Sequence, residues 1–401
     1  MTFPQFFGLF MKRKRWRRLL GVFAIGIFLS VGPATQAWQA ARLEQVQSEA
    51  IPAAEFSHII QETSEADGFF RSDNFISNET SYLHVVEKMR RLGALGGAYV
   101  GVGPEQNFTY IAKIRPQIAF IVDIRRQAMI QHLMFKAIFT VSENRLQFLA
   151  RLFSKSVNGE DVPAPDSPVD QILKYVDDAP AFEQTFNTNL ASIRETIEKD
   201  FQFPLSERDL TSLSFVYGAF RNENLNIQYR SGSGNWGGPQ WGFFPTLKDL
   251  IMQQDLHGKL GNFLASEDDY EFLRRLHRNN RIIPIVGDFA GPKALATVGE
   301  YLRKHGQTVT AFYTSNVEQY LFANGSFGAF VENVRKLPIT ERSLFIRAFP
   351  NMREPHPARV SPHRLTTLLQ RMRVFLEDFD QGLYQDYWAL VTTHFIQGDD
   401  P

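Results

Sequence analysis

Two glycines and an acid in one short stretch are the residues of this chain best suited to holding a ligand. Residues 101–107 read GVGPEQN and follow an apolar run, and Asp123 ends the next apolar run. Glycines such as Gly101 and Gly103 let a ligand approach the backbone closely, and an acid after the next strand can accept hydrogen bonds from ribose hydroxyls. The alternative is a tight turn and a helix-capping acid in a unit that binds nothing.

The residues after the two glycines favour one class of nucleotide-like ligand. The dinucleotide pattern requires a glycine where this chain has Gln106, and Glu105 stands where a pyrophosphate would approach the helix N-terminus. A carboxylate there repels phosphate, whereas S-adenosylmethionine has no phosphate and carries a sulfonium and an ammonium group. We therefore expect a site for S-adenosylmethionine rather than a dinucleotide, built from Gly101, Gly103, Glu105, Asn107 and Asp123.

Two later strand ends carry further polar groups. Residues 287–293 (GDFAGPK) and 313–320 (YTSNVEQY) each follow an apolar run, and open α/β sheets bind ligands at the carboxyl ends of their strands. We predict that Asp288, Asn316 and Glu318 face the substrate. The alternative for Asp288 and Asn316 is that each caps the helix after it.

Other segments give weaker indications of a site. The stretch 231–242 (SGSGNWGGPQWG) is either a lid or substrate clamp that uses Trp236, Trp241 and the nearby His257, or a surface loop with a structural histidine. Glu79, in the stretch SNE, could reach the edge of the cofactor, although a helix cap is the preferred interpretation. The chain has no cysteine and no HExxH motif, so no metal site is predicted.

The elements that position these residues alternate between strands and helices. Short apolar, β-branched runs predict buried strands at 98–102, 118–122, 282–286, 309–313 and 343–348, and helical periodicity separates them. This alternation indicates an α/β, Rossmann-like fold with a mostly parallel sheet and helices on both faces. We expect a domain over residues 56–350 that carries a helical insertion at about 131–280, followed by a helical C-terminal extension at 351–401.

The N-terminal 37 residues differ in character from the remainder. They contain six basic residues before residue 19, no acidic residue, and the apolar run LLGVFAIGIFLSV at 19–31. This pattern predicts a secretory signal peptide or an uncleaved anchor at 1–37, with a linker at 38–55, and an exported domain that is periplasmic or anchored to the inner membrane. Without the basic cluster the chain has 37 basic and 43 acidic residues, which argues against a nucleic-acid binder.

The stretch GVGPEQNFTYIAKIRPQIAFIVDIRRQ resembles the first motif and the acidic second-strand end of class I methyltransferases. Together with DNFISNE, DYEFLRRLHRNNRIIPIVGDFAGPKAL and AFYTSNVEQYLF, it resembles a family of uncharacterised bacterial proteins described as methyltransferase-like and Rossmann-type. The resemblance implies that Gly101, Gly103 and Asp123 line the cofactor and that Asp288 faces the reaction. The family motif often has a third glycine where this chain has Glu105.

Two functions follow from these patterns. The first is an S-adenosylmethionine-dependent, methyltransferase-like protein with a small-molecule ligand, and the second is a non-catalytic exported or envelope-associated binding protein. Export favours the second, because the methyl donor is made in the cytoplasm. The sequence leaves the methyl acceptor and the oligomeric state open.

Overall fold

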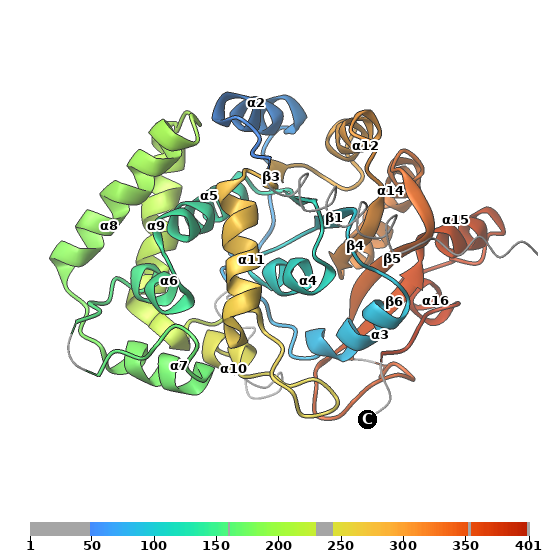
Figure 1. Ribbon diagram of the computed structural model, residues 1–401. Coiled ribbons are helices and arrows are strands. Elements are labelled where there is room, and N and C mark those ends of the chain that lie inside the picture. Colours follow the sequence, from blue (N-terminus) through green and yellow to red (C-terminus); the bar gives the residue numbers. More distant parts are fainter. Residues whose placement is uncertain (1–48, 159–160, 230–243, 352–353, 399–401) are drawn as a thin grey trace, which may run out of the picture. The chain divides into compact units, whose positions relative to one another are not determined.

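The computed structural model describes residues 49–158, 161–229, 244–351 and 354–398. Its centre is a six-stranded sheet in the order β3-β2-β1-β4-β5-β6, in which β1 to β5 are parallel and β6 pairs antiparallel with β5 (Figure 1). The predicted Rossmann-like α/β fold is confirmed. The strands are β1 (Ala98–Gly101), β2 (Ile118–Asp123), β3 (Ile282–Val286), β4 (Val309–Ser315), β5 (Ile339–Pro350) and β6 (Leu365–Arg371).

The central strands are buried on both faces, as their continuous apolar sequences require. Every residue of β1, β2 and β3 is buried. In the register of the sheet, Val100 of β1 lies level with Phe120 of β2 and Phe312 of β4. Because neighbouring strands begin level with one another, their carboxyl ends also meet at one edge.

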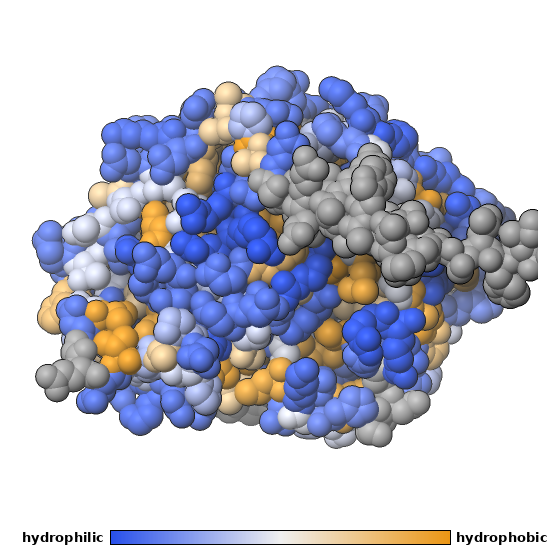
Figure 2. All heavy atoms as spheres, in the orientation of Figure 1, coloured by the Kyte–Doolittle hydropathy of each residue, from blue (hydrophilic) through white to orange (hydrophobic). Residues whose placement is uncertain are grey.

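Helices cover the two faces of the sheet. One face carries α4 (Gln106–Ile114) and α11 (Glu267–Arg278), which contact each other and lie in front of the sheet in Figure 1. Figure 2 shows this side of the molecule as mainly hydrophilic, with separate apolar areas. The other helices next to the sheet are α12 (Ala294–Lys304), α13 (Val317–Ala323), α14 (Phe327–Arg335) and α15 (Met372–Asp380).

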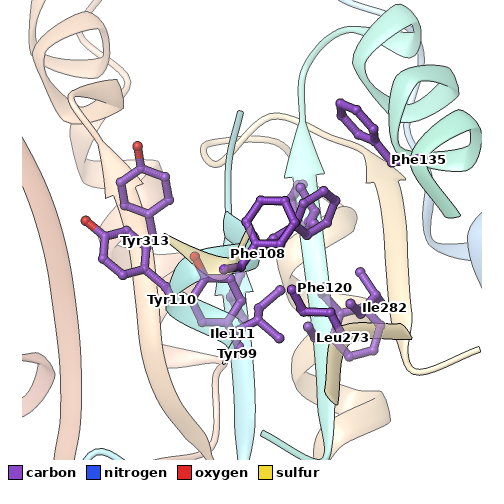
Figure 3. Close-up of a cluster of buried hydrophobic side chains, with 14 of the residues drawn as sticks. Tyr99, Phe108, Tyr110, Ile111, Phe120, Phe135, Leu273, Ile282 and Tyr313 are labelled. Carbon is purple, nitrogen blue, oxygen red and sulfur yellow. The ribbon is translucent and has the colours of Figure 1, made fainter. Parts of the chain in front are cut away.

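Aromatic rings pack around α4, against β4 on one side and against α5 (Arg126–Val141) on the other. The rings of Tyr110 and Tyr313 lie 5.1 Å apart between centroids, and Phe108 packs edge-on against Phe135 at 5.6 Å (Figure 3). Such edge-to-face and tilted pairs add to the free energy gained by burying the rings. The packing holds α4 firmly against the strand ends that surround the candidate site.

The segment between β2 and β3 is rich in helices, as expected for an insertion. Its first helix, α5 (Arg126–Val141), is buried around most of its circumference, because β2, β3, α9 (Glu207–Glu223) and α11 all pack against it. Helix α9 has a Ser206–Asp209 capping box that the sequence interpretation missed. The helices before α11 are α5 (Arg126–Val141), α6 (Arg145–Leu152), α7 (Val169–Asp178), α8 (Glu183–Glu195), α9 (Glu207–Glu223) and α10 (Leu247–Ile251).

The two ends of the described chain differ from the prediction. Helix α2 (Ala53–Thr63) begins inside the predicted linker, because Phe56 and Ile60 bury their side chains and the helix packs on β3. The C-terminal extension, predicted as helical, supplies strand β6 before α15 and α16 (Tyr387–Thr392). The extension is therefore part of the sheet.

The basic and apolar N-terminal residues lie outside the described residues. Among the residues that are described, no helix combines the length and the hydrophobicity that a membrane span requires.

Candidate functional site

A cavity of about 970 Å³ lies at the carboxyl ends of the parallel strands. Its volume is at the upper end of the range for small-molecule sites, and its position is where open α/β sheets bind ligands. We call it the strand-end pocket. It is lined by the strand ends and loops at 102–104, 122–125, 287–289, 315–317 and 349–350, by residues 69–71, 74 and 76–79, and by side chains from 229, 244, 364–365 and 387–388, among others.

The loop after β1 is held open by Asn107. Its side-chain amide donates to the carbonyl oxygens of Val102, Gly103 and Pro104 at 2.7–3.0 Å, and its oxygen accepts from Tyr99. A Cβ on Gly101 would lie 2.0 Å from the Asn107 oxygen. Asn107 therefore braces the loop from behind and does not line the pocket, and Gly101 is needed for the approach of Asn107 and not of a ligand.

Gly103 is the glycine that borders the pocket. Its φ is +77°, a conformation that favours glycine, and no atom lies within 4 Å of where its Cβ would be. The His132 ring nitrogen Nε2 hydrogen-bonds to its carbonyl oxygen at 2.8 Å. Burial lowers the pKa of His132 to about 4, so the ring is neutral and donates through Nε2. At Gly103 the loop therefore has open space where a side chain would be, while the Gly103 carbonyl oxygen already accepts a hydrogen bond.

An Asn107→Leu variant is expected to lose about 1–3 kcal/mol of stability, because three loop carbonyls and the Tyr99 hydroxyl each lose a hydrogen bond, although the Gly103 carbonyl keeps the one from His132. Urea unfolding of the variant and the wild type measures the loss. Asn187→Leu on the exposed side of α8 is the matched control and should change stability by less than about 0.5 kcal/mol. Equal losses in the two variants would show that the Asn107 amide does not brace the loop.

Glu105 is turned away from the strand-end pocket, contrary to the prediction. Its carboxylate accepts the backbone N–H of Ser77 and faces an apolar region that includes Phe135 and Leu152. Burial raises the pKa of Glu105 to about 8, so the group is largely neutral at pH 7. The argument that Glu105 repels phosphate is therefore wrong, because the group neither carries a full charge at pH 7 nor lines the strand-end pocket.

Asp123 lines the pocket at the end of β2, as predicted, but it is not free. Its carboxylate accepts the Arg125 backbone N–H and two guanidinium N–H groups of the same residue at 2.9–3.0 Å. Burial opposes ionisation of Asp123, yet the Arg125 charge outweighs it and lowers the pKa of Asp123. Arg125 in turn donates to the carbonyl oxygens of Ser72 and Asp73. The pair fixes the segment around residue 72 against the end of β2.

Glu79 is a buried carboxylate in the pocket wall. It is 2% exposed, and it accepts the hydroxyls of Tyr313 and Ser315 at 2.7 and 2.5 Å and the side-chain amide of Gln106 at 2.8 Å. Burial raises the pKa of Glu79, and these three hydrogen bonds partly offset that effect. The sequence interpretation preferred a helix cap for Glu79, but the structure shows that Glu79 does not cap a helix. It joins the start of α4, which follows β1, to the end of β4, and the strand order reverses between β1 and β4.

Of the three residues predicted to face the substrate, two line the pocket and one does not. Asp288 and Asn316 line the pocket. Asp288 does not cap α12, because Glu65 accepts the backbone N–H groups of Lys293 and Ala294 there. Asn316 stands at the cap position of α13 but makes no capping hydrogen bond with its side chain.

Glu318 does not reach the pocket, which corrects the prediction. It is fully buried on the other side of α13, where it pairs with Arg347 of β5 at 2.8 Å. Its neighbours Val317 and Gln319 line the pocket, but Glu318 itself does not.

The remaining predicted residues add little to the site. Trp236 and Trp241 lie outside the described residues, and His257 is exposed, in a turn around Asp255, and does not line the pocket. Within the described ranges, no group of three or more His, Asp or Glu side chains could hold a metal ion.

A comparison with protein-family models matches residues 74–161 and 167–394 of the chain to one model. The chain belongs to this family, Domain of unknown function (DUF7790). The DUF7790 match includes all six strands of the sheet and nearly all of the pocket lining, from Asn74 to Trp388. A comparison with curated proteins found no match.

Three residues of this DUF7790 domain line the pocket although the sequence did not assign them to it with preference: Glu79 was interpreted as a helix cap, and Arg125 and Arg364 were not among the predicted site residues. Arg125 stands two residues after Asp123, a spacing that allows a local ion pair, and this signal was available in the sequence. Glu79 and Arg364 come from loops far from the β1–β2 unit, and only the folded chain brings them to the same cavity.

Proposed function

We propose that the protein binds S-adenosylmethionine in the strand-end pocket and transfers its methyl group to a small-molecule acceptor. The observation that carries this proposal is the pocket itself, which runs along the open Gly103 loop and past Asp123 and Asp288 at three adjacent strand ends. An adenosine-bearing molecule laid across these ends would place its ribose near Asp123, at the end of β2.

The chemistry of the loop after β1 supports a ligand without phosphate. A phosphate site requires several free backbone N–H groups at the start of the helix, and Pro104 has none. The charges of the lining also favour a cation, because four carboxylates (Glu79, Asp123, Asp288 and Glu354) line the cavity with three arginines (Arg71, Arg125 and Arg364). Of these arginines, Arg125 is engaged by Asp123 and two carbonyl oxygens. This argument replaces the one that relied on Glu105.

Glu79 is the residue best placed to accept a proton in this reaction. S-adenosylmethionine would supply a methyl group whose bond to sulfur breaks, with the electron pair left on sulfur, as the acceptor's nucleophilic atom bonds to the carbon. Glu79 could take the proton that this atom loses, since burial raises the pKa of Glu79 above the ordinary value of a carboxyl and the side chain lines the cavity. The hydroxyls of Tyr313 and Ser315 hold its carboxylate in one orientation.

Isothermal calorimetry with S-adenosylmethionine on the full chain tests the proposal, and a folded sample that gives no heat at millimolar ligand would reject it. We expect Gly103→Val to weaken binding at least tenfold, because its side chain would enter the cavity. Gly306→Val is the matched control, since Gly306 also has a positive φ of 63° and open space at its Cβ but lies outside the pocket lining. Equal binding by the two variants would contradict the assignment of the Gly103 loop.

A non-catalytic exported binding protein is the second candidate function. The basic cluster and the apolar run at 19–31 favour it, because an exported domain would meet little of a cytoplasmic methyl donor. Fractionation of cells would show whether the protein reaches the periplasm. Mass spectrometry of small molecules that co-purify with it would then separate the candidates, since the second predicts a bound metabolite other than S-adenosylmethionine.

A further inference from the structure

The part of the strand-end pocket beside β5 and β6 holds a cluster of aromatic rings, in addition to the rings of Phe69, Phe70, Tyr229, Phe289 and Tyr313 that also line the pocket. It is lined by aromatic rings and one arginine, and we call it the aromatic side, defined by Tyr320, Phe349, Tyr387, Trp388, Phe244 and Arg364. The rings of Phe349 and Trp388 pack edge-on, with their centroids 5.4 Å apart. Walls of this kind favour a planar apolar body.

Arg364 provides an unused hydrogen-bond donor in this wall. Its guanidinium lies over the Phe244 ring at 4.7 Å, and this contact limits the orientations that the side chain can adopt. Its Nη1 atom is buried yet has no hydrogen-bond partner in the described structure. A buried guanidinium nitrogen without an acceptor is costly, and such a group is expected to meet its partner in the bound state.

We propose that the aromatic side binds a planar aromatic carboxylic acid, with its carboxylate on the Arg364 guanidinium. This inference rests on the proposed function, in which the acid is the methyl acceptor. A guanidinium matches a carboxylate in geometry and can form two parallel hydrogen bonds with it.

The charges around the aromatic side select a carboxylate over a phosphate. Besides Arg364, the lining includes Arg71, which already has an interaction partner, and the exposed Glu354, so a dianion would be less well compensated than a monoanion. Glu79 lines the same cavity from the switch point between β1 and β4. An acceptor held by Arg364 could therefore reach towards both the methyl donor and the residue that takes its proton.

Binding of matched acid and amide pairs to the full chain tests this inference without any enzyme activity. The probes are benzoate, 4-hydroxybenzoate and indole-3-carboxylate, each compared with its carboxamide by ligand-observed NMR and calorimetry. We expect at least one acid to bind tenfold or more tightly than its amide. We expect Arg364→Gln to abolish this preference and Arg364→Lys to restore part of it. Arg359→Gln, at an exposed arginine that does not line the pocket, is the control and should leave the preference unchanged.

The outcomes separate this inference from the proposed function. If no acid binds more tightly than its amide, or if Arg364→Gln retains the preference, the assignment of Arg364 is overturned. Titration of Arg364→Gln with S-adenosylmethionine measures the affinity of the part of the pocket at the ends of β1 to β3. The dissociation constant should stay within about threefold of the wild-type value. If neither the wild type nor the variant binds S-adenosylmethionine while the acid preference stands, the proposed function fails and the carboxylate site remains.

Discussion

An Arg347→Met variant is expected to lose about 3–5 kcal/mol of stability, because it leaves the buried Glu318 carboxylate without its positive partner. Both residues are almost completely buried, at 2% and 0% exposure, and the guanidinium donates to Glu318 at 2.8 Å and to Gln370 at 2.8 Å. Removing one partner of such a pair forces the other either to stay charged in the interior or to take up a proton. Urea unfolding at pH 7 measures the loss.

The double variant Glu318→Gln/Arg347→Met separates the loss of a charge partner from the loss of packing. We expect it to be more stable than Arg347→Met alone, since the neutral amide no longer needs a counter-charge. Arg347 also stacks on Phe345 at 4.4 Å, and both variants lose this contact equally. If the double variant is no more stable than the single one, the cost comes from packing and the ion pair contributes little.

The second large effect is a rise in stability with pH that depends on Lys136. This residue of α5 is 1% exposed, its ammonium lies between the rings of Phe56 and Phe201 at 4.7 and 4.3 Å, and its hydrogen bond goes to the His277 carbonyl oxygen. Burial lowers the pKa of Lys136 to about 7. A lysine in the unfolded chain has an ordinary pKa near 10.4, so the two states bind different numbers of protons above pH 7.

The direction of the effect follows from that difference. Between about pH 7 and pH 10 the unfolded chain holds the Lys136 proton and the folded chain does not, so raising the pH favours the folded state. Below pH 7 both states are protonated, and the cost of burying the ammonium is fully present. The slope approaches about 1.4 kcal/mol per pH unit for one proton. The folded protein should therefore gain about 2–3 kcal/mol from this group between pH 7.5 and 9.5.

Comparison with Lys136→Met isolates this contribution from those of other groups. Because the pKa of Glu105 is raised to about 8 in the folded state, Glu105 lowers the stability as the pH rises to about 8. This effect is the same in the wild type and in Lys136→Met, so it cancels in the comparison. The stability difference between the wild type and Lys136→Met should change by about 2–3 kcal/mol from pH 7.5 to 9.5 in urea unfolding. Lys304→Met, at an exposed position near the end of α12, should show no such trend. Parallel curves for the wild type and Lys136→Met would mean that Lys136 stays charged in the folded state.

The sequence alone predicted the parallel strands of the sheet and several residues of the cavity at their carboxyl ends. The apolar runs at 98–102, 118–122 and 282–286 are buried strands, and Gly103, Asp123 and Asp288 line a cavity at their carboxyl ends. These features are local, because a continuous β-branched run and the glycine after it depend on a few neighbouring residues. The C-terminal strand β6 was missed, since its place in the sheet depends on pairing with β5.

What the sequence determined is which segments form the sheet and where its strands end, because that information is carried by the spacing of apolar residues. What only the tertiary structure decided is where the charged side chains point. Glu105 points into the interior because it accepts the Ser77 backbone N–H, and Glu318 does so because it pairs with Arg347. Glu79 extends from its loop to the end of β4, where it accepts the Tyr313 hydroxyl. These partners lie 28, 29 and 234 residues away in the chain for Glu105, Glu318 and Glu79, respectively. Such contacts form only when the fold closes, because a buried charge adopts the orientation in which a distant donor can satisfy it.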